Sequence, residues 1–67
     1  MIKISVNDRI HECVDTISLQ ALLQELQINT QGIAVAINQE VILKSSWKET
    51  ALKNDDSILI IQATQGG

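Results

Sequence analysis

Ile58-Leu59-Ile60-Ile61-Gln62-Ala63-Thr64-Gln65-Gly66-Gly67 closes the chain, and in it an apolar run of strand length passes through a polar step into two glycines. The apolar run predicts a strand that anchors this end of the chain in a core. Because glycine has no Cβ, Gly66 and Gly67 can lie extended in a channel too narrow for a side chain. We therefore expect a folded domain of residues 1–63 followed by a flexible tail of residues 64–67.

The last strand also predicts a surface beside the tail. Alternate residues of a strand point to opposite faces, so Leu59, Ile61 and Ala63 lie opposite Ile58 and Ile60. If a helix covers one set, the other forms an open apolar patch, which is typical of a docking surface for a partner. The alternative is that loops of the same chain cover this patch.

The α-carboxylate of Gly67 is the reactive group that this tail presents. A carboxylate is a poor electrophile, but its attack on the α-phosphate of ATP gives an acyl adenylate, which a sulfur or amine nucleophile can open. Thr64, Gln65 and Gly66 would then belong to a substrate of another protein. The alternative is that the terminal glycines are a frayed chain end.

Composition limits the remaining possibilities. A chain of 67 residues supports one core. Its 45% hydrophobic and 19% charged residues are typical of a globular domain, and its formal charge of -3 argues against a nucleic-acid partner. A single cysteine, no long apolar span and no signal sequence predict a cytoplasmic protein that makes no use of a membrane.

Hydrophobic periodicity predicts the other elements. Leu19, Leu22, Leu23 and Leu26 recur at the spacing of one helical face, and Ser18 precedes them as a candidate N-cap. The predicted strands are residues 1–6, 9–14, 33–38, 41–43 and 58–61, and the predicted helices are residues 19–27 and a short turn at 46–49. Five strands and one main helix close a core as a two-layer α+β fold.

Specific residues define the turns. Asn7-Asp8 suits a tight hairpin turn, after which we expect Ile10 and Val14 on the core side of the second strand and His11 and Cys13 on the opposite side.

Two further local patterns lie in the second half of the chain. Ser46 with Glu49 fits a capping box, so a short helical turn should begin there, with Trp47 holding it to the core. Asn54-Asp55-Asp56 predicts a turn in which Asn or Asp takes the left-handed conformation.

Groups that could perform catalysis are sparse. His11 and Cys13 are too few for a structural zinc site, and Cys13 has no oriented base to activate it as a nucleophile. Asp55 and Asp56 fit turn formers better than a catalytic pair. The sequence predicts no catalytic residue, no metal site and no cofactor bound by the chain itself, so activation of the tail would be the work of another protein.

The whole pattern resembles the ThiS family of ubiquitin-like sulfur carriers in thiamine biosynthesis. The resemblance rests on the order of elements, on Val35-Ala36-Ile37-Asn38, on Trp47 after a short strand, on Asp56-Ser57-Ile58 and on Gly66-Gly67. It implies a β-grasp fold, a mixed five-stranded sheet in which the first and last strands pair in parallel and the main helix packs across one face. Asp55 departs from the glycine that relatives often have in this turn.

Membership would imply a reaction cycle. A ThiF-type adenylyltransferase uses ATP and magnesium to adenylate the Gly67 carboxylate, and sulfur taken from cysteine by a cysteine desulfurase converts it to a thiocarboxylate. Thiazole synthase (ThiG) then receives the sulfur. Only Gly66 and Gly67 match the family's functional motif directly, and the protein would be a carrier and substrate, not an enzyme.

Two rival functions remain at this point. The small subunit of molybdopterin synthase shares the fold and the Gly-Gly chemistry, although that family is usually longer and commonly has prolines before the tail, whereas this chain has no proline. A ubiquitin-like interaction module without sulfur transfer is the second rival.

Overall fold

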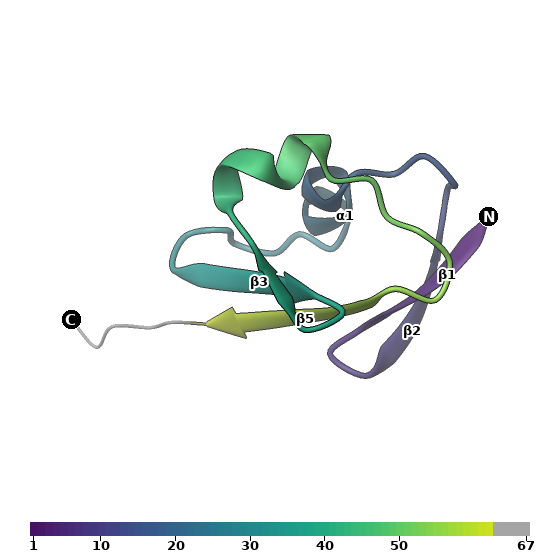
Figure 1. Ribbon diagram of the computed structural model, residues 1–67, viewed down its shortest axis with the longest axis horizontal. Coiled ribbons are helices and arrows are strands. Elements are labelled where there is room, and N and C mark those ends of the chain that lie inside the picture. The colour runs from purple at the N-terminus through teal and green to yellow at the C-terminus, as the bar shows by residue number, and fades with distance from the viewer. Residues whose placement is uncertain (63–67) are drawn as a thin grey trace.

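The structure is a computed structural model that describes residues 1–62, so Ala63, Thr64, Gln65, Gly66 and Gly67 lie outside the described residues. The strands are β1 (Ile2–Val6), β2 (Arg9–Cys13), β3 (Ile33–Ile37), β4 (Glu40–Ile42) and β5 (Ser57–Gln62). They form one sheet in the order β2-β1-β5-β3-β4. The α-helix α1 (Leu19–Glu25) and the 3-10 helix η1 (Lys44–Glu49) lie on the same side of this sheet (Figure 1).

The central pair of strands is parallel. β1 and β5 run side by side in the same direction, with Val6 opposite Ile58, and all other neighbouring strands are antiparallel. This mixed five-stranded sheet with a helix across one face is the β-grasp fold, which confirms the predicted architecture. β5 therefore lies inside the sheet, between β1 and β3.

The hairpin between β1 and β2 has the predicted turn but the opposite register. Asn7 and Asp8 have positive φ angles of 50° and 72°, as a two-residue turn requires. A turn of this length places the flanking residues Val6 and Arg9 directly opposite each other. Because Val6 faces the core, every second residue from Arg9 onward faces the same side.

The expectation for the second strand was therefore wrong. Ile10 and Val14 are 69% and 54% exposed, whereas Cys13 is buried and His11 is partly buried. The prediction followed the apolar character of Ile10 and Val14, but the length of the turn decides which face each residue takes.

Helix α1 begins where the sequence predicts and ends earlier. Ser18 is the N-cap, and its hydroxyl accepts a hydrogen bond from the backbone N–H of Ala21 at 3.1 Å. Gln27 has a φ of +57°, and the N–H of Ile28 donates to the carbonyl of Leu23 at 3.1 Å. This left-handed termination stops the helix before Gln27, which the sequence placed inside it.

The core lies between the helices and the sheet. Leu19, Leu22 and Leu23 of α1 are almost wholly buried, as the helical spacing predicted. They pack in one cluster with side chains from the strands and from η1; its buried members also include Ile4, Val6, Cys13, Ile17, Val35, Trp47, Leu52 and Ile58.

The 3-10 helix η1 starts before the predicted capping box. Leu43, not Ser46, is the N-cap residue, and no side chain caps this end. Ser46 lies inside the helix, with its N–H donating to the Leu43 carbonyl at 2.8 Å. Trp47 does hold η1 to the core as predicted, since it is 3% exposed and its Nε1–H donates to the Ile42 carbonyl at 3.0 Å.

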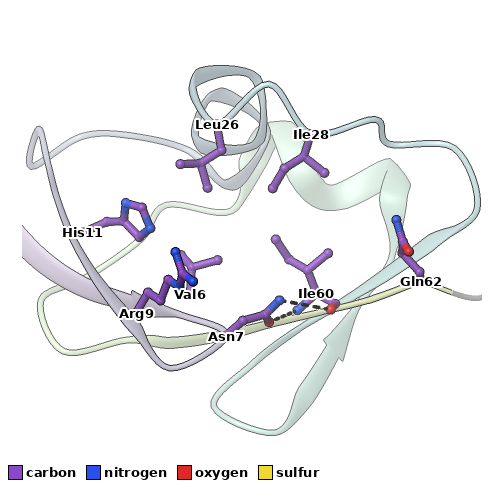
Figure 2. Close-up of a pocket in the computed structure, with 8 residues that line it drawn as sticks. All are labelled: Val6, Asn7, Arg9, His11, Leu26, Ile28, Ile60 and Gln62. Carbon is purple, nitrogen blue, oxygen red and sulfur yellow. Dashed lines mark hydrogen bonds between the residues drawn. The ribbon is translucent and has the colours of Figure 1, made fainter.

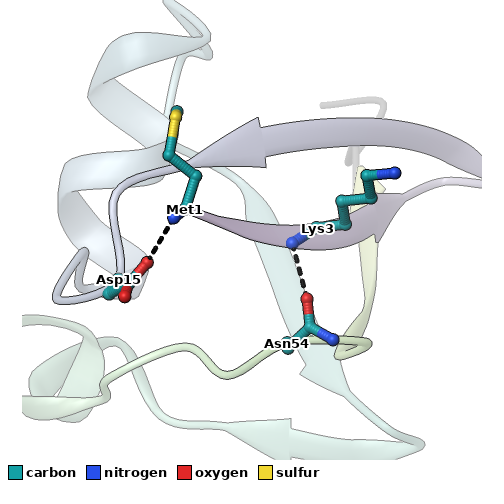
Figure 3. A network of polar contacts seen from close by, with 4 residues as sticks. All are labelled: Met1, Lys3, Asp15 and Asn54. Carbon is teal, nitrogen blue, oxygen red and sulfur yellow. Dashed lines mark hydrogen bonds and ion pairs between the residues drawn. The ribbon is translucent and has the colours of Figure 1, made fainter.

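The turn before β5 is attached to the beginning of β1. Figure 3 shows the Lys3 N–H donating to Asn54 Oδ1, at 2.9 Å, close to the ion pair between the Met1 amine and Asp15. The N–H of Asp55 donates to the Lys3 carbonyl at 2.7 Å, and Asp55 has the expected left-handed φ of 73°. These bonds set β5 in position beside β1. Within residues 1–62, no helix is long and apolar enough to cross a membrane.

Candidate functional site

The two faces of β5 have different environments. Ile58 is 1% exposed beneath the helices, whereas Leu59 and Ile61 on the opposite face are 49% and 45% exposed. The predicted alternation of the last strand is thus confirmed for the residues that the structure describes. The third predicted docking residue, Ala63, lies outside them.

Leu59 and Ile61 belong to a larger apolar surface. Cross-strand pairing places Leu59 beside Ala36, Ala36 beside Val41, and Ile61 beside Ala34. Residues directly opposite each other in antiparallel strands project to the same face. Val41 is 65% exposed. We call this surface the open-face patch; it comprises the exposed side chains of Val41, Leu59 and Ile61, with the partly buried Ala34 and the buried Ala36 between them.

The sequence interpretation did not include Val41 in this surface. The signal was present, because the alternation of β4 places Val41 opposite Ile42, and Ile42 packs against the core. Both β3 residues between β4 and β5 on this face are alanines, Ala34 and Ala36.

Side-chain amides fix the start of β5. Asn38 Oδ1 accepts from the Ser57 N–H at 3.0 Å, and Asn38 Nδ2 donates to Asp56 Oδ1 at 3.0 Å. The other oxygen of Asp56 accepts from the Lys53 N–H at 2.8 Å. Asn38 has a positive φ of 52°, a conformation that Asn tolerates better than most residues.

A second asparagine holds β5 closer to the tail. β1 ends at Val6, but the side chain of Asn7 takes the place of a further strand residue (Figure 2). Its Oδ1 accepts from the Ile60 N–H at 2.8 Å and its Nδ2 donates to the Ile60 carbonyl at 3.5 Å. These bonds tie β5 to the end of β1 two residues before β5 ends at Gln62. The sequence predicts a turn at Asn7 and the end of a strand at Asn38, and neither pattern indicates these contacts with β5.

The described part of the chain offers little chemistry of its own. Burial raises the pKa of the Cys13 thiol, and the charge of Glu25 raises it further, so the thiol is held in its unreactive neutral form. Among residues 1–62, no group of three His, Cys, Asp or Glu side chains is placed to hold a metal ion. The arrangement supports presentation of a chain end and a docking surface. The predicted reactive residues, Gly66 and Gly67, lie outside the described residues.

A β-grasp domain whose central strand leads into a Gly-Gly end defines the class of ubiquitin-like proteins. The sequence model of the ThiS family matches residues 4–67. The chain therefore belongs to the ThiS family, as the resemblance indicated.

Similar proteins cover almost the whole chain. It is 31% identical over 65 residues to the "Sulfur carrier protein ThiS" of Escherichia coli (strain K12), covering 97% of this chain and 98% of that protein. It is 29% identical over 65 residues to a "Thiazole synthase" of Paramagnetospirillum magneticum, covering 97% of this chain but 20% of that protein. The crystal structure of the thiamine biosynthesis protein (ThiS) from Geobacter metallireducens matches the fold with a TM-score of 0.85 at 20% identity, covering 98% of this chain and 100% of that one.

Proposed function

We propose that this protein is a sulfur carrier of thiamine biosynthesis that bears the transferred sulfur on the carboxyl group of Gly67. The observation that carries the proposal is the family match, which extends through Gly67 and so includes the Gly-Gly end. Its near full-length similarity to the carrier from Escherichia coli supports the same role.

The chemistry at Gly67 proceeds in two steps. In the first, an oxygen of the carboxylate attacks the α-phosphorus of ATP on a ThiF-type adenylyltransferase, and pyrophosphate leaves with magnesium balancing its charge. In the second, the outer sulfur of a persulfide on a partner protein attacks the acyl carbon and AMP leaves, which gives an acyl disulfide; a thiol of the partner then attacks the inner sulfur, so the S–S bond breaks, a disulfide forms on the partner and the thiocarboxylate is released. The sulfur comes from cysteine through a cysteine desulfurase.

The tail residues have a steric role in this scheme. Gly66 and Gly67 pass through a narrow channel of the adenylating enzyme because they have no side chains. Thr64 and Gln65 span the distance between the folded domain and that channel. ATP and magnesium belong to the partner enzyme, and the carrier itself is a substrate in the cytoplasm, not a catalyst.

The open-face patch is the proposed docking surface for these enzymes, together with Ala63, which the sequence predicts on the same face of the last strand. Its support is the exposure of Leu59 and Ile61 on β5, the strand that leads toward Gly67. Apolar surface that is exposed in the free protein and removed from water in a complex is the usual source of binding energy.

Thiazole synthase is the proposed acceptor of the sulfur. The protein named thiazole synthase in Paramagnetospirillum magneticum contains a segment similar to this chain, which covers 20% of its length. A carrier-like segment joined to a protein of that name supports a direct encounter between the two functions.

Reconstitution with a ThiF-type enzyme, a desulfurase and thiazole synthase tests the proposal. The full chain should support formation of the thiazole product, and a variant that lacks Gly66 and Gly67 should not, although it stays folded. A truncated variant that keeps its function would indicate an interaction module. Selective function with molybdopterin synthase instead would place the chain in that pathway.

A further inference from the structure

A cleft opens on the helix side of the sheet, on the face opposite the open-face patch. Its volume is about 520 Å³. Figure 2 shows Leu26 and Ile28 entering it from the end of α1, and Val6 and Ile60 from the sheet. The left-handed turn at Gln27, which ends α1, brings Ile28 to this place.

The cleft has a polar and basic rim around this apolar floor. Asn7, Arg9, His11 and Gln62 complete its lining, and no Asp or Glu is among the lining residues. The ion pair found within residues 1–62 joins the Met1 amine to Asp15, so the guanidinium of Arg9 has no carboxylate partner in the described structure. An unpaired basic group in a chain of formal charge -3 favours an anionic ligand here.

The cleft adjoins the point where the chain leaves the sheet. Ile60 and Gln62 of β5 line the cleft, whereas Leu59 and Ile61 of the same strand belong to the open-face patch. Any enzyme that encloses the residues after Gln62 must therefore lie close to both surfaces.

We propose that this cleft is a second contact surface for the enzyme that receives the tail. It takes an extended segment of that enzyme in which an apolar side chain contacts Leu26, Ile28 and Ile60 while a neighbouring carboxylate pairs with Arg9. Guanidinium and carboxylate match in geometry as two parallel hydrogen bonds, so the pair sets the orientation of the segment as well as its affinity. The inference rests on the proposed function, because it needs a partner that engages the tail.

A matched pair of charge reversals tests the cleft. Arg9→Glu and Lys48→Glu make the same change in net charge, but Lys48 lies on η1, away from the cleft. With a ThiF-type enzyme, Arg9→Glu should raise the KM for the carrier in adenylation about tenfold and leave kcat unchanged, because it removes one ion pair and adds a repulsion. Lys48→Glu should change the KM less than about twofold. Equal effects of the two variants would overturn the proposal.

NMR signals of the backbone amides give an independent readout of binding that needs no turnover. In the labelled protein, the amides of Val6, Leu26 and Ile28 should respond to added unlabelled enzyme together with those of the open-face patch. A response of the patch alone would contradict the second surface. Cleft signals that respond to an enzyme which does not adenylate the chain when ATP and magnesium are supplied would retain the cleft while refuting the proposed chemistry.

Other occupants would produce different signals in the free protein. If removal of Gly66 and Gly67 shifts the cleft amides, the cleft holds the chain's own end. If these signals depend on protein concentration, it holds a second copy. Either result would overturn the assignment to a partner enzyme.

Discussion

The two faces of β5 differ in what they contribute to the molecule. On one face, Ile58 packs beneath α1 and is buried. Leu59, its neighbour in sequence, lies on the opposite face and stays about half exposed. Full burial of an apolar side chain contributes about 1.5 to 3 kcal/mol to folding, and a half-exposed one leaves about half of that free energy to be gained in a complex. One strand thus contributes to stability on one side and carries the proposed docking surface on the other.

The difference between the two faces explains how one short strand can contribute to the core and also to the proposed docking surface. Both sets of residues are equally hydrophobic, so composition does not separate them. The position of α1 and η1 on one side of the sheet separates them, and this position follows from the chain connections (Figure 1). Substitutions on the two faces should therefore change different measured quantities.

The largest effect on stability should come from Leu23→Ala. Leu23 is fully buried in the core cluster, so its truncation should lower the free energy of unfolding by about 2 to 5 kcal/mol. Leu59→Ala removes the same atoms from a half-exposed site that leaves no enclosed cavity, and should cost about 1 kcal/mol or less. Urea unfolding of both variants measures the contrast. Similar losses in the two variants would show that the faces are not distinct.

The next largest effect should be the loss of partner affinity in Leu59→Asp. A carboxylate in the open-face patch would lose its hydration in a complex, so the Kd for a ThiF-type enzyme should rise at least about tenfold. Val14→Asp makes the same kind of change at an exposed site beyond β2, and should leave the Kd nearly unchanged. Isothermal titration calorimetry compares them. An unchanged Kd for Leu59→Asp would remove the patch from the docking surface.

A smaller effect is expected when Asn7 no longer holds β5. Asn7→Gly keeps the positive φ of the turn but removes both side-chain hydrogen bonds to Ile60, at a cost of about 1 kcal/mol. Hydrogen exchange should accelerate more at the Ile60 amide than at the Leu59 amide, because the Ile60 N–H is the one that loses its acceptor on Asn7. Equal acceleration at both amides would indicate general destabilisation instead.

The smallest effect concerns the Met1 amine, which lies away from both faces of β5. The hydrogen bond to Asp15, followed by the charge of Asp15, raises the pKa of this amine. A raised pKa in the folded state stabilises the protein below the unfolded-state pKa, and this contribution is lost as the pH rises through the folded-state pKa. Both groups are exposed, so solvent screens the pair.

The pH dependence of one variant checks this sign. The difference in unfolding free energy between the wild type and Asp15→Asn should be small at neutral pH and should vanish at alkaline pH. A difference that grows with rising pH would contradict the assigned ion pair.

Much of the fold could be predicted from the sequence because local patterns agree with the tertiary arrangement. The helical spacing of Leu19, Leu22 and Leu23 and the cap at Ser18 define α1, and the alternation of Ile2, Ile4 and Val6 defines β1. Each of these signals is contained within one element. They also agree with one another, which is typical of sequences that specify a single fold.

The errors arose where one element depends on another. Apolar residues alone placed Ile10 toward the core, whereas the two-residue turn pairs Val6 with Arg9 and directs Ile10 to solvent. The pattern of Ser46 and Glu49 fits a cap, but the chain enters η1 directly from β4 and the helix starts earlier. The cleft could not be predicted either, because it requires α1 and β5 to be placed in space.

In the candidate site, too, patterns within one element could be predicted from the sequence, whereas contacts between elements could not. Alternation along β5 predicted that Leu59 and Ile61 share a face, and the structure confirms it. Val41 joins them only through pairing across β3, and Asn7 reaches Ile60 only because β1 and β5 are parallel neighbours. The roles of Gly66 and Gly67 stay predictions from the sequence and the family.

The most direct test of the central claim is top-down mass spectrometry of the carrier after incubation with a ThiF-type enzyme, ATP, magnesium, cysteine and a desulfurase. Exact mass and fragment localisation are needed, because oxidation of Met1 or Cys13 gives the same nominal mass change. We predict that one oxygen of Gly67 is replaced by sulfur, and only when ATP is present. An unmodified Gly67 in the presence of partners that are active on another carrier would contradict it.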